Sequence, residues 1–428
     1  MSLPEPGCEP FFSSADGIAG RLRATPEDFS VVERELLPPE AVDGRHCVVR
    51  VTARNRETNL LIRVLARTLG IQPRAIGFAG TKDKRAVTTQ LMTVRASMEA
   101  IATVNLAGVT IEPLHRTLKP LRLGQLRGNR FVIRVANTKD SETRIPVILE
   151  ELNERFPNYF GVQRFGASRP VTHLVGEAML QSDWQRAVET YIGAPSTESV
   201  DTSEAHAEAE AARAHYRDTS DLAGTLEALP GRLLFERQLV GHLLRNPDDW
   251  QGALQRLPPN LQQMFIHAAQ AALFNTMVAQ RISQELPLDV PEVGDIVLPA
   301  DRHGGPDQRV PIVVNERNQP KLTKRCAEGK AWVTALLPGF SAPFADGPQG
   351  EIERKVVTES GIARENYALP EAPRLASDGL RRPIHATAQA LEWSMESGVP
   401  EFRFTLDKGT YATSFMREIM KAEDSRAY

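Results

Sequence analysis

The chain of 428 residues is long enough for two or three domains, and its 41% hydrophobic and 25% charged residues are ordinary for a soluble globular protein. Its three cysteines are far apart and odd in number, which argues against a disulfide framework and indicates a reducing compartment. No apolar run approaches the roughly 20 residues that a membrane span requires. The acidic N-terminus is not typical of a signal peptide, and the histidines and cysteines show no metal-ligand spacing.

The net charge of −3 is unevenly distributed along the chain. Residues 1–170 carry 25 Lys and Arg against 18 Asp and Glu, a net charge of +7, whereas the remaining residues sum to −10. Within the basic part, residues 113–139 contain no acid and seven cations: Arg116, Lys119, Arg122, Arg127, Arg130, Arg134 and Lys139. Such a stripe is typical of a surface that binds a phosphate backbone. The alternative is a sheet edge that its cations keep soluble.

In the first part of the chain, the spacing of apolar residues predicts alternating strands and helices. Strands are expected over residues 29–33, 47–53, 75–79, 86–94 and 131–136. Residues 57–69 have apolar side chains at helical spacing and are followed by Gly70, a residue favoured just after a helix. A second helix is expected over residues 145–156, so this part should form a mixed α/β layer.

After Gly166 the pattern changes. Residues 172–192 and 233–285 are expected to be helical, and 197–221 is an Ala- and Glu-rich segment expected to form an exposed helix or a mobile crossing. A Pro- and Gly-rich stretch then predicts short strands near 296–298, 310–314 and 331–337. The C-terminal part predicts a helix over 386–397, a strand over 402–406 and a last helix from about residue 414.

The most distinctive local pattern is residues 77–90, Gly-Phe-Ala-Gly-Thr-Lys-Asp-Lys-Arg-Ala-Val-Thr-Thr-Gln. Gly80 lets the backbone turn between two expected strands. Asp83 lies between Lys82 and the pair Lys84–Arg85, and such neighbours favour an ionised carboxylate and attract a polyanion. A P-loop is excluded because the glycines are too close and no hydroxyl residue follows Lys82. From these residues alone, an exposed charged turn is the alternative.

This segment resembles the active-site motif of the TruD-type tRNA pseudouridine synthases. Further matches to that family occur at the expected places along the chain. They are Leu-Arg-Ala-Thr-Pro-Glu-Asp-Phe-Ser-Val-Val-Glu at 22–33, Leu-Arg-Leu-Gly at 121–124, Gly-Asn-Arg-Phe at 128–131, Asn-Tyr-Phe-Gly-Val-Gln-Arg-Phe-Gly at 158–166, and Gly-Thr-Tyr-Ala-Thr-Ser-Phe-Met-Arg-Glu at 409–418. The blocks span the chain from end to end.

The resemblance implies an α+β fold with a mixed-sheet pseudouridine synthase catalytic domain and a large inserted α/β (TRUD) domain. The catalytic domain would be discontinuous, over residues 1–169 and 379–428, with the insertion over 170–378. The motifs at 22–33, 77–90 and 409–418 must converge on one site, which fits an insertion between them. In the family the insertion forms one wall of an RNA-binding cleft.

The implied activity is that of an isomerase, which converts a uridine of tRNA, at position 13, to pseudouridine. The N1–C1′ bond is broken and C5 is joined to the same C1′, so no cofactor or metal is expected. Asp83 would be the catalytic carboxylate, and the target base would be flipped out of its stack. The expected partner is tRNA, with no membrane association. We expect a cytoplasmic monomer.

Asn129 and Phe131 point to the same face of an extended segment. The resemblance places them beside the uracil, Asn129 at its edge and Phe131 on its face, and a core Phe behind a turn Asn is the alternative. Arg23 stands where the family often has Lys, and its cation would hold Asp83 ionised. The other residues expected to contact substrate or RNA are Phe29, Lys82, Lys84, Arg85, Arg116, Lys119, Arg122, Arg164 and Phe165.

Two alternative functions stay open. One is a catalytically silent tRNA-binding protein or chaperone, against which the intact loop around Asp83 argues. The other is the same enzyme acting at another uridine, such as position 35. The sequence also leaves open whether Asp83 attacks the sugar, attacks the base or removes a 2′ proton.

Overall fold

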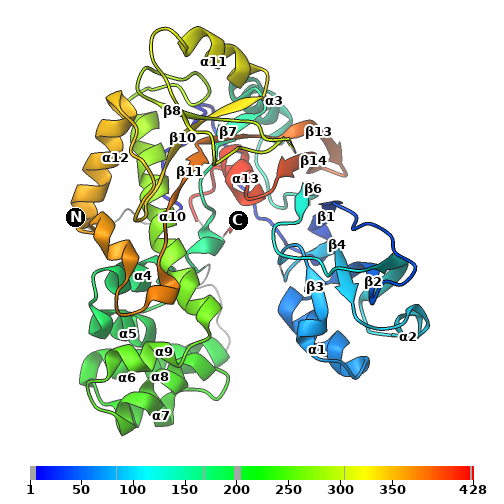
Figure 1. The fold of residues 1–428 in the computed structure, drawn as a ribbon, viewed down its shortest axis with the longest axis vertical. Helices are drawn as coiled ribbons and strands as arrows, with labels where there is room; N and C mark the ends of the chain where they lie inside the picture. The colour runs from blue at the N-terminus through cyan, green and yellow to red at the C-terminus, as the bar shows by residue number, and fades with distance from the viewer. Residues whose placement is uncertain (1–5, 83, 167–168, 197–203, 303, 425–426) are drawn as a thin grey trace. The chain divides into compact units, whose positions relative to one another are not determined.

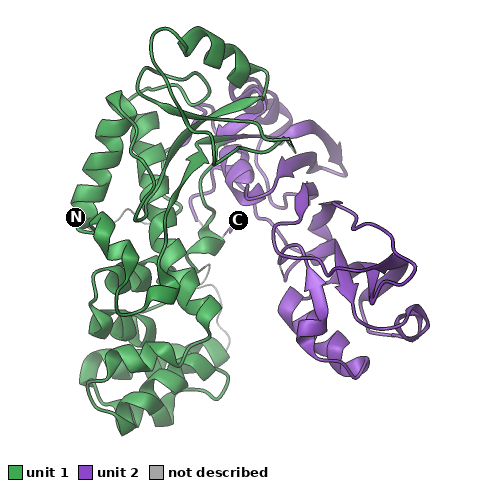
Figure 2. Ribbon diagram, viewed as in Figure 1, with its two compact units in different colours: residues 1–10, 157–385 green, residues 11–156, 386–428 purple. Residues whose placement is uncertain are grey.

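The computed structural model describes residues 6–82, 84–166, 169–196, 204–302, 304–424 and 427–428. The chain forms two compact units, coloured in Figure 2: unit 1 consists of residues 1–10 and 157–385, and unit 2 of residues 11–156 and 386–428. Unit 2 is therefore discontinuous in sequence, with unit 1 inserted into it. The divisions at 156/157 and 385/386 differ from those expected at 169/170 and 378/379, and the first ten residues belong to the inserted unit. Both units mix helices with strands, and the α+β class is confirmed.

Unit 2 is built on a mixed sheet that Figure 1 shows beside helix α1 and helix α13. Among the described residues, eight strands form it in the order β13-β14-β6-β1-β4-β2-β5, with β3 paired to β4. β1 and β4 run parallel, and the other pairs are antiparallel. The strands are β1 Phe29–Glu35, β2 His46–Arg54, β3 Ile76–Phe78, β4 Val87–Val94, β5 Val109–Thr117, β6 Leu126–Arg134, β13 Gln389–Glu396 and β14 Val399–Asp407.

One face of this sheet carries two separate apolar cores. Its helices are α1 Thr58–Thr68, α2 Met98–Ala102, α3 Ser141–Leu152 and α13 Ala412–Met420. Side chains of α3 and α13 pack on β1, β6 and β14, whereas α1 packs on β2, β3 and β4. The register places Phe131, Val31 and Thr88 side by side on the same face. Both cores therefore cover the same face, and the next row of that face lies at their junction.

The helix expected over residues 386–397 is wrong, because residues 389–396 form strand β13. Its side chains alternate between partly buried and exposed, which is the period of a strand at a sheet edge. β13 and β14 form a hairpin whose two-residue loop, Ser397 and Gly398, has φ of 53° and 80°. Such a loop, with both residues at positive φ, matches the twist of the flanking strands. The Ser-Gly dipeptide was the overlooked signal.

Unit 1 combines helices with a small sheet of order β11-β10-β8-β9. Its long central helix, α10, packs against α4 so closely that a Cβ on Gly176 would lie 1.9 Å from the carbonyl oxygen of Phe265. The elements are α4 Thr172–Leu180, α5 Trp184–Gly193, α6 Glu204–Thr219, α7 Leu222–Ala228, α8 Leu234–Arg245, α9 Trp250–Gln255, α10 Pro259–Ser283, α11 Gln319–Ala327, α12 Gly347–Ser360, β8 Ile296–Pro299, β9 Ile312–Val313, β10 Ala331–Leu337 and β11 Leu380–Pro383.

Two short strands, β7 Arg155–Pro157 and β12 His385–Thr387, contain the points where the chain passes from one unit to the other. No helix among the described residues is long and apolar enough to cross a membrane.

A buried histidine lies at the start of α4 in unit 1. His173 is 3% exposed, and its ring meets that of Phe165 edge to face, with 5.4 Å between centroids. Burial lowers the pKa of His173 to about 4. The imidazole is therefore neutral in the folded protein over the pH range in which an unfolded histidine gains its proton.

His173 should make unit 1 sensitive to acid. Between pH 6.5 and 4 the unfolded state binds a proton that the folded state does not, so stability should fall as the pH falls. The lost free energy of unfolding should reach about 3 kcal/mol at pH 4. Urea unfolding at several pH values measures this slope for wild type and for His173→Phe, which cannot titrate. Identical slopes for the two proteins would assign the acid sensitivity to other groups.

Candidate active site

The loop between β3 and β4 is held at both of its ends. The backbone N–H of Lys82 donates to Thr58 Oγ1 at 2.8 Å, which ties the loop to the first turn of α1. At the other end Ala86 is fully buried, and its carbonyl accepts from Asn55 N at 2.9 Å. The glycine that the packing requires is Gly77, because a Cβ there would lie 2.5 Å from Leu121 O. The expectation for Asp83 lies outside the described residues.

Lys82 forms a buried ion pair beneath this loop. Its Nζ lies 2.7 Å from Glu33 Oε2, and the two side chains are only 5% and 1% exposed. An ammonium group enclosed in this way is bound by its partner, because separating two buried charges costs far more than separating two exposed ones. The residue before Asp83 is therefore fixed through both its backbone and its side chain. RNA contact by Lys82 stays a prediction, and its burial favours a structural role.

Glu33 belongs to a polar row on the inner face of the sheet, which we define as Gln90, Glu33 and Asn129. Glu33 is the register partner of Asn129, and Gln90 follows Thr89, whose partner is Val32. The oxygens Glu33 Oε1, Gln90 Oε1 and Asn129 Oδ1 are buried and have no hydrogen-bond partner among the described residues. Buried acceptors are nearly always paired in native proteins. The polar row thus has unused hydrogen-bonding capacity at the junction of the two cores.

Arg23 lies next to Phe29 rather than at the surface. Arg23 is 9% exposed, and its backbone has a positive φ of 56°. Its guanidinium carbon lies 4.0 Å from the centroid of the Phe29 ring. The carbonyl of Arg23 accepts from Arg85 Nη2 at 3.2 Å, which links the 22–33 motif to the loop of Asp83. The structure therefore brings these two sequence motifs together.

Phe131 is part of an aromatic stack inside unit 2. Its ring is nearly parallel to that of Phe404, with 5.4 Å between centroids, and it meets the Phe29 ring edge to face at 6.2 Å. Phe131 is 6% exposed and Phe29 is 1% exposed. One face of the Phe131 ring is thus covered by Phe404. A uracil would have to use the other face, so base stacking stays a prediction.

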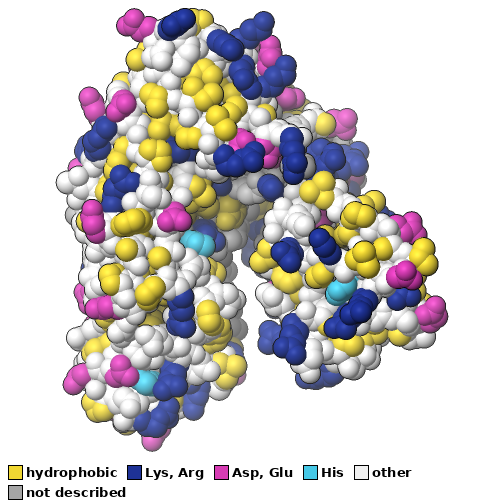
Figure 3. Space-filling model, in the orientation of Figure 1, with side chains coloured by type: hydrophobic (Ala, Val, Ile, Leu, Met, Phe, Trp, Pro, Cys, Tyr) yellow, Lys and Arg dark blue, Asp and Glu magenta, His cyan; other side chains and the backbone are white. Residues whose placement is uncertain are grey.

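Several of the predicted RNA-binding cations are exposed on unit 2, and Figure 3 shows Lys and Arg side chains over the face of unit 2 that is in view. The exposed predicted residues are Lys84, Arg85, Arg116, Lys119 and Arg122. Arg116 Nε donates to Gly44 O at 2.8 Å, which orients its side chain. In the wider basic stripe Arg134 is paired with Glu401 and Glu396, each at 2.7 Å. The stripe is therefore partly neutralised within the sheet.

Arg164 and Phe165 belong to unit 1, whereas the other predicted site residues belong to unit 2. Phe165 is 1% exposed and packs on Ala268, Ala271 and Ala272 of α10. Their motif is fastened to the same helix, because Phe160 N donates to Asn275 Oδ1 at 2.8 Å and Phe160 O accepts from Asn275 Nδ2 at 3.0 Å. These contacts are internal to unit 1, and RNA contact by Arg164 and Phe165 stays a prediction.

Sequence reasoning assigned no role to three residues of this region: Thr58 and Glu33, which bond to Lys82, and Gln90 of the polar row. A signal for Glu33 was present, because it follows Phe29 and Val31 at the strand period and so shares their inward face. A charged side chain at an inward position of a strand is costly unless it is paired, so it predicts a buried partner of opposite charge. Among the described residues, no group of three His, Cys, Asp or Glu side chains is placed to hold a metal ion.

Known proteins that are similar to this chain point to one family. A family model described as tRNA pseudouridine synthase D (TruD) matches residues 5–419. Curated relatives named probable tRNA pseudouridine synthase D include one from Methanococcoides burtonii, 38% identical over 97% of this chain and 96% of the relative, and one from Thermococcus sibiricus, 36% identical over 96% and 97%. A crystal structure of a tRNA pseudouridine synthase D (TruD) from Methanosarcina mazei is 34% identical, covers 100% of both chains and has a TM-score of 0.82.

Removing one member of the buried ion pair should destabilise the protein strongly. Glu33→Gln removes the charge that compensates Lys82 without changing side-chain size, and we expect a loss of about 3–5 kcal/mol in the free energy of unfolding. Glu27→Gln is the matched control, because Glu27 pairs with Arg54 in an exposed position of the same unit and should change stability little. Denaturant unfolding measures both.

A second variant separates charge from packing. Adding Lys82→Met to Glu33→Gln removes the unpaired ammonium and should restore most of the lost stability. Equal losses for Glu33→Gln and Glu27→Gln, or no recovery in the double variant, would show that the pair is not the anchor of the loop.

Proposed function

Since the chain belongs to the tRNA pseudouridine synthase D (TruD) family, we propose that its site converts uridine 13 of tRNA to pseudouridine with Asp83 as the catalytic carboxylate. The family match, together with the homologues' names, makes the protein a tRNA pseudouridine synthase, an isomerase. The observation that supports the assignment to this loop is the double anchoring of Lys82, the residue directly before Asp83.

The reaction needs a fixed group at the sugar and a pocket that retains the free base. The N1–C1′ bond breaks, the uracil turns, and C5 bonds to the same C1′; C5 then loses its proton and N1 gains one, so the atoms balance. A carboxylate can serve such a reaction as nucleophile or as base. Asp83 is the one acidic residue between Glu57 and Glu99, so no neighbour in that stretch of sequence can replace it.

We assign base recognition to Asn129 and Phe131. A uracil edge presents an N3–H donor between two carbonyl acceptors, and an amide side chain can accept from the first and donate to the second. The buried Asn129 Oδ1, without a partner among the described residues, supports this assignment. Arg23 would act as the cation near Asp83, because it is held at Phe29 and joined through its carbonyl to Arg85.

The exposed cations would bind the RNA backbone. Lys84 and Arg85 flank Asp83, and Arg116, Lys119 and Arg122 extend the positive surface of unit 2. Phosphate contacts position an RNA but do not identify its bases, so these residues should add affinity rather than the choice of uridine. We further propose that the protein acts as a cytoplasmic monomer, without metal or cofactor.

Replacing Asp83 tests the catalytic assignment and the position together. Asp83→Asn should abolish pseudouridine at position 13 while tRNA affinity changes little, because affinity comes from the cations. Pseudouridine is mapped in tRNA treated with wild type, with Asp83→Asn, and with Asp43→Asn, an exposed carboxylate of the same unit, as control. Residual conversion above a few per cent in Asp83→Asn would exclude the catalytic role. Modification at another uridine by wild type would exclude position 13.

Phe131 needs a test that separates stacking from packing, because an Ala variant would cost about 3–5 kcal/mol of stability in either case. Phe131→Leu keeps an apolar side chain but loses the ring face, and Phe404→Leu does the same one strand away in the same stack. If the uracil stacks on Phe131, its Leu variant should lower the single-turnover rate by roughly 5–150-fold more than Phe404→Leu does. Equal rates at equal stability would assign Phe131 to the core alone.

A further inference from the structure

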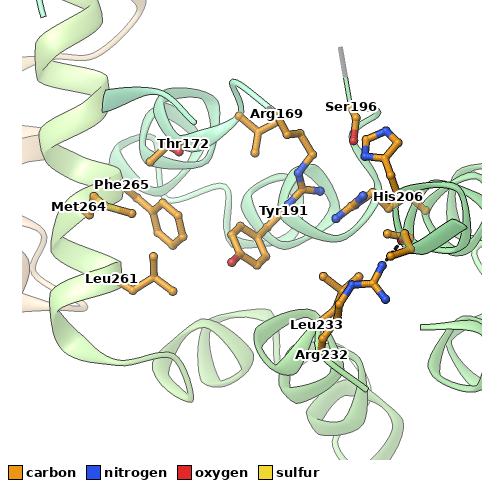
Figure 4. Close-up of a pocket in the computed structure, with 14 residues that line it drawn as sticks. Arg169, Thr172, Tyr191, Ser196, His206, Arg232, Leu233, Leu261, Met264 and Phe265 are labelled. Atoms are coloured by element: carbon orange, nitrogen blue, oxygen red, sulfur yellow. Dashed lines mark hydrogen bonds between the residues drawn. The ribbon is translucent and has the colours of Figure 1, made fainter. Parts of the chain in front are cut away.

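Unit 1 contains a cavity that the proposed chemistry does not use. It has a volume of about 440 Å³ and is lined by residues of α4, α5, α6 and α10 together with the segments just before α4, after α5 and before α8. This volume is within the range of small-ligand sites. Figure 4 shows its two different sides: Leu261, Met264 and Phe265 on one, and Arg169, His206 and Arg232 on the other, with Tyr191 between them.

The basic side of the cavity holds more positive charge than its neighbours neutralise. Arg169 Nη2 and Arg213 Nη2 lie 3.6 and 3.5 Å from the same oxygen, Glu236 Oε1. All three side chains are close to or more than nine-tenths buried, at 11%, 8% and 8% exposure. Burial and the nearby Arg213 charge lower the pKa of Arg169. Two guanidinium groups therefore share one carboxylate in a place where water screens them little.

A second acid near these arginines, Glu210, has hydrogen bonds to other groups. Glu210 Oε1 accepts from both terminal nitrogens of Arg217 at 3.1 Å, and Glu210 Oε2 accepts from Ser196 N at 3.0 Å. Glu210 Oε2 also forms an ion pair with Arg213 Nη1 at 3.8 Å, which is too long for a hydrogen bond, so Glu210 is shared between Arg213 and Arg217. Arg213 Nε is buried and has no partner among the described residues. A donor remains available on Arg213, which lines the cavity.

The other side of the cavity can receive a flat, weakly polar group. The Tyr191 and Phe265 rings meet nearly edge to face, with 5.5 Å between centroids and 67° between planes. Leu261 and Met264, four residues and one residue before Phe265 on α10, extend the same apolar wall. A ligand with a planar base at one end and a phosphate at the other matches both sides at once.

We propose that this cavity binds one unstacked nucleotide of the RNA substrate, with its phosphate at Arg169 and Arg213 and its base against Tyr191 and Leu261. The proposal rests on the proposed function, since it assumes that the substrate is an RNA. A stacked base and a neutralised phosphate would give unit 1 its own hold on the tRNA, separate from recognition of the target uracil.

The test adds a carboxylate to the cavity and asks whether tRNA affinity falls. Met264→Glu places the charge at a 40% exposed position that lines the cavity, and Leu244→Glu places the same charge at a 41% exposed position of α8 that does not. The dissociation constant for a tRNA transcript should rise at least five-fold in Met264→Glu relative to Leu244→Glu. Arg232→Glu, at another exposed position of the lining, should act like Met264→Glu and covers the case in which that variant does not fold.

Ultraviolet crosslinking of the wild-type complex identifies the residue in contact. A nucleotide adduct should appear on the peptide that carries Tyr191, weaken in Met264→Glu and persist in Leu244→Glu. Equal affinities in the two variants, or adducts elsewhere but none at Tyr191, would overturn the proposal.

Two further outcomes are distinguishable. If free 5′-UMP binds wild type, in calorimetry, and tRNA does not displace it, the cavity belongs to a free nucleotide and the RNA assignment is wrong. If wild type crosslinks tRNA at Tyr191 but forms no pseudouridine, the proposed function fails while the cavity assignment stands.

Discussion

The ion pair between Lys82 and Glu33 lies where the two apolar cores of unit 2 meet on one face of the sheet. Helices α1 and α13 belong to different cores, and neither core contains the row between them. That row is the polar row of Gln90, Glu33 and Asn129, and the negative charge of Glu33 is paired with the ammonium group of Lys82. In a setting of low dielectric constant, each charge stabilises the other strongly and would be costly alone. The loop that carries Asp83 is consequently tied to the centre of the sheet and not only to its own two strands.

The loop also shows why the same residue types can serve opposite purposes. Lys82, Lys84 and Arg85 form one cationic cluster in the sequence, yet Lys82 is buried and paired whereas the other two are exposed. The alternation of strand β1 separates them, because it turns Glu33 inward beneath the loop. A cation that faces a buried carboxylate stabilises the fold, and one that faces solvent is available to a phosphate. These three cations are all within two residues of Asp83, so distance along the sequence does not distinguish the two roles.

The parts of the fold that could be predicted from sequence are those in which one local pattern dominates. The alternating β1 and β2 and the helically spaced α1 all occur close to their expected positions. Segment 386–397 was mispredicted because its apolar residues fit a helix as well as a strand, and only the Ser397–Gly398 turn decides between them. For the candidate site, the motifs pointed to the loop and to Asn129, whose roles stay predictions. Thr58 and Gln90 could not be found, because their contribution depends on the packing of α1 and on the register between β1 and β4, which are separated by more than fifty residues.

A reaction that neither adds nor removes atoms places particular demands on such a site. In the proposed reaction, acceleration would come from groups that are already positioned when the substrate arrives. The chain fixes Lys82, the residue before Asp83, by two hydrogen bonds and buries Ala86 three residues after Asp83, so the chain is held on both sides of that position. The polar row beneath keeps three acceptors without partners among the described residues. Unpaired buried acceptors are costly, and a uracil that donates its N–H group to one of them would recover part of that cost only when bound. The free-energy cost of the unpaired acceptors would thus favour binding of a base that carries a hydrogen-bond donor at that edge.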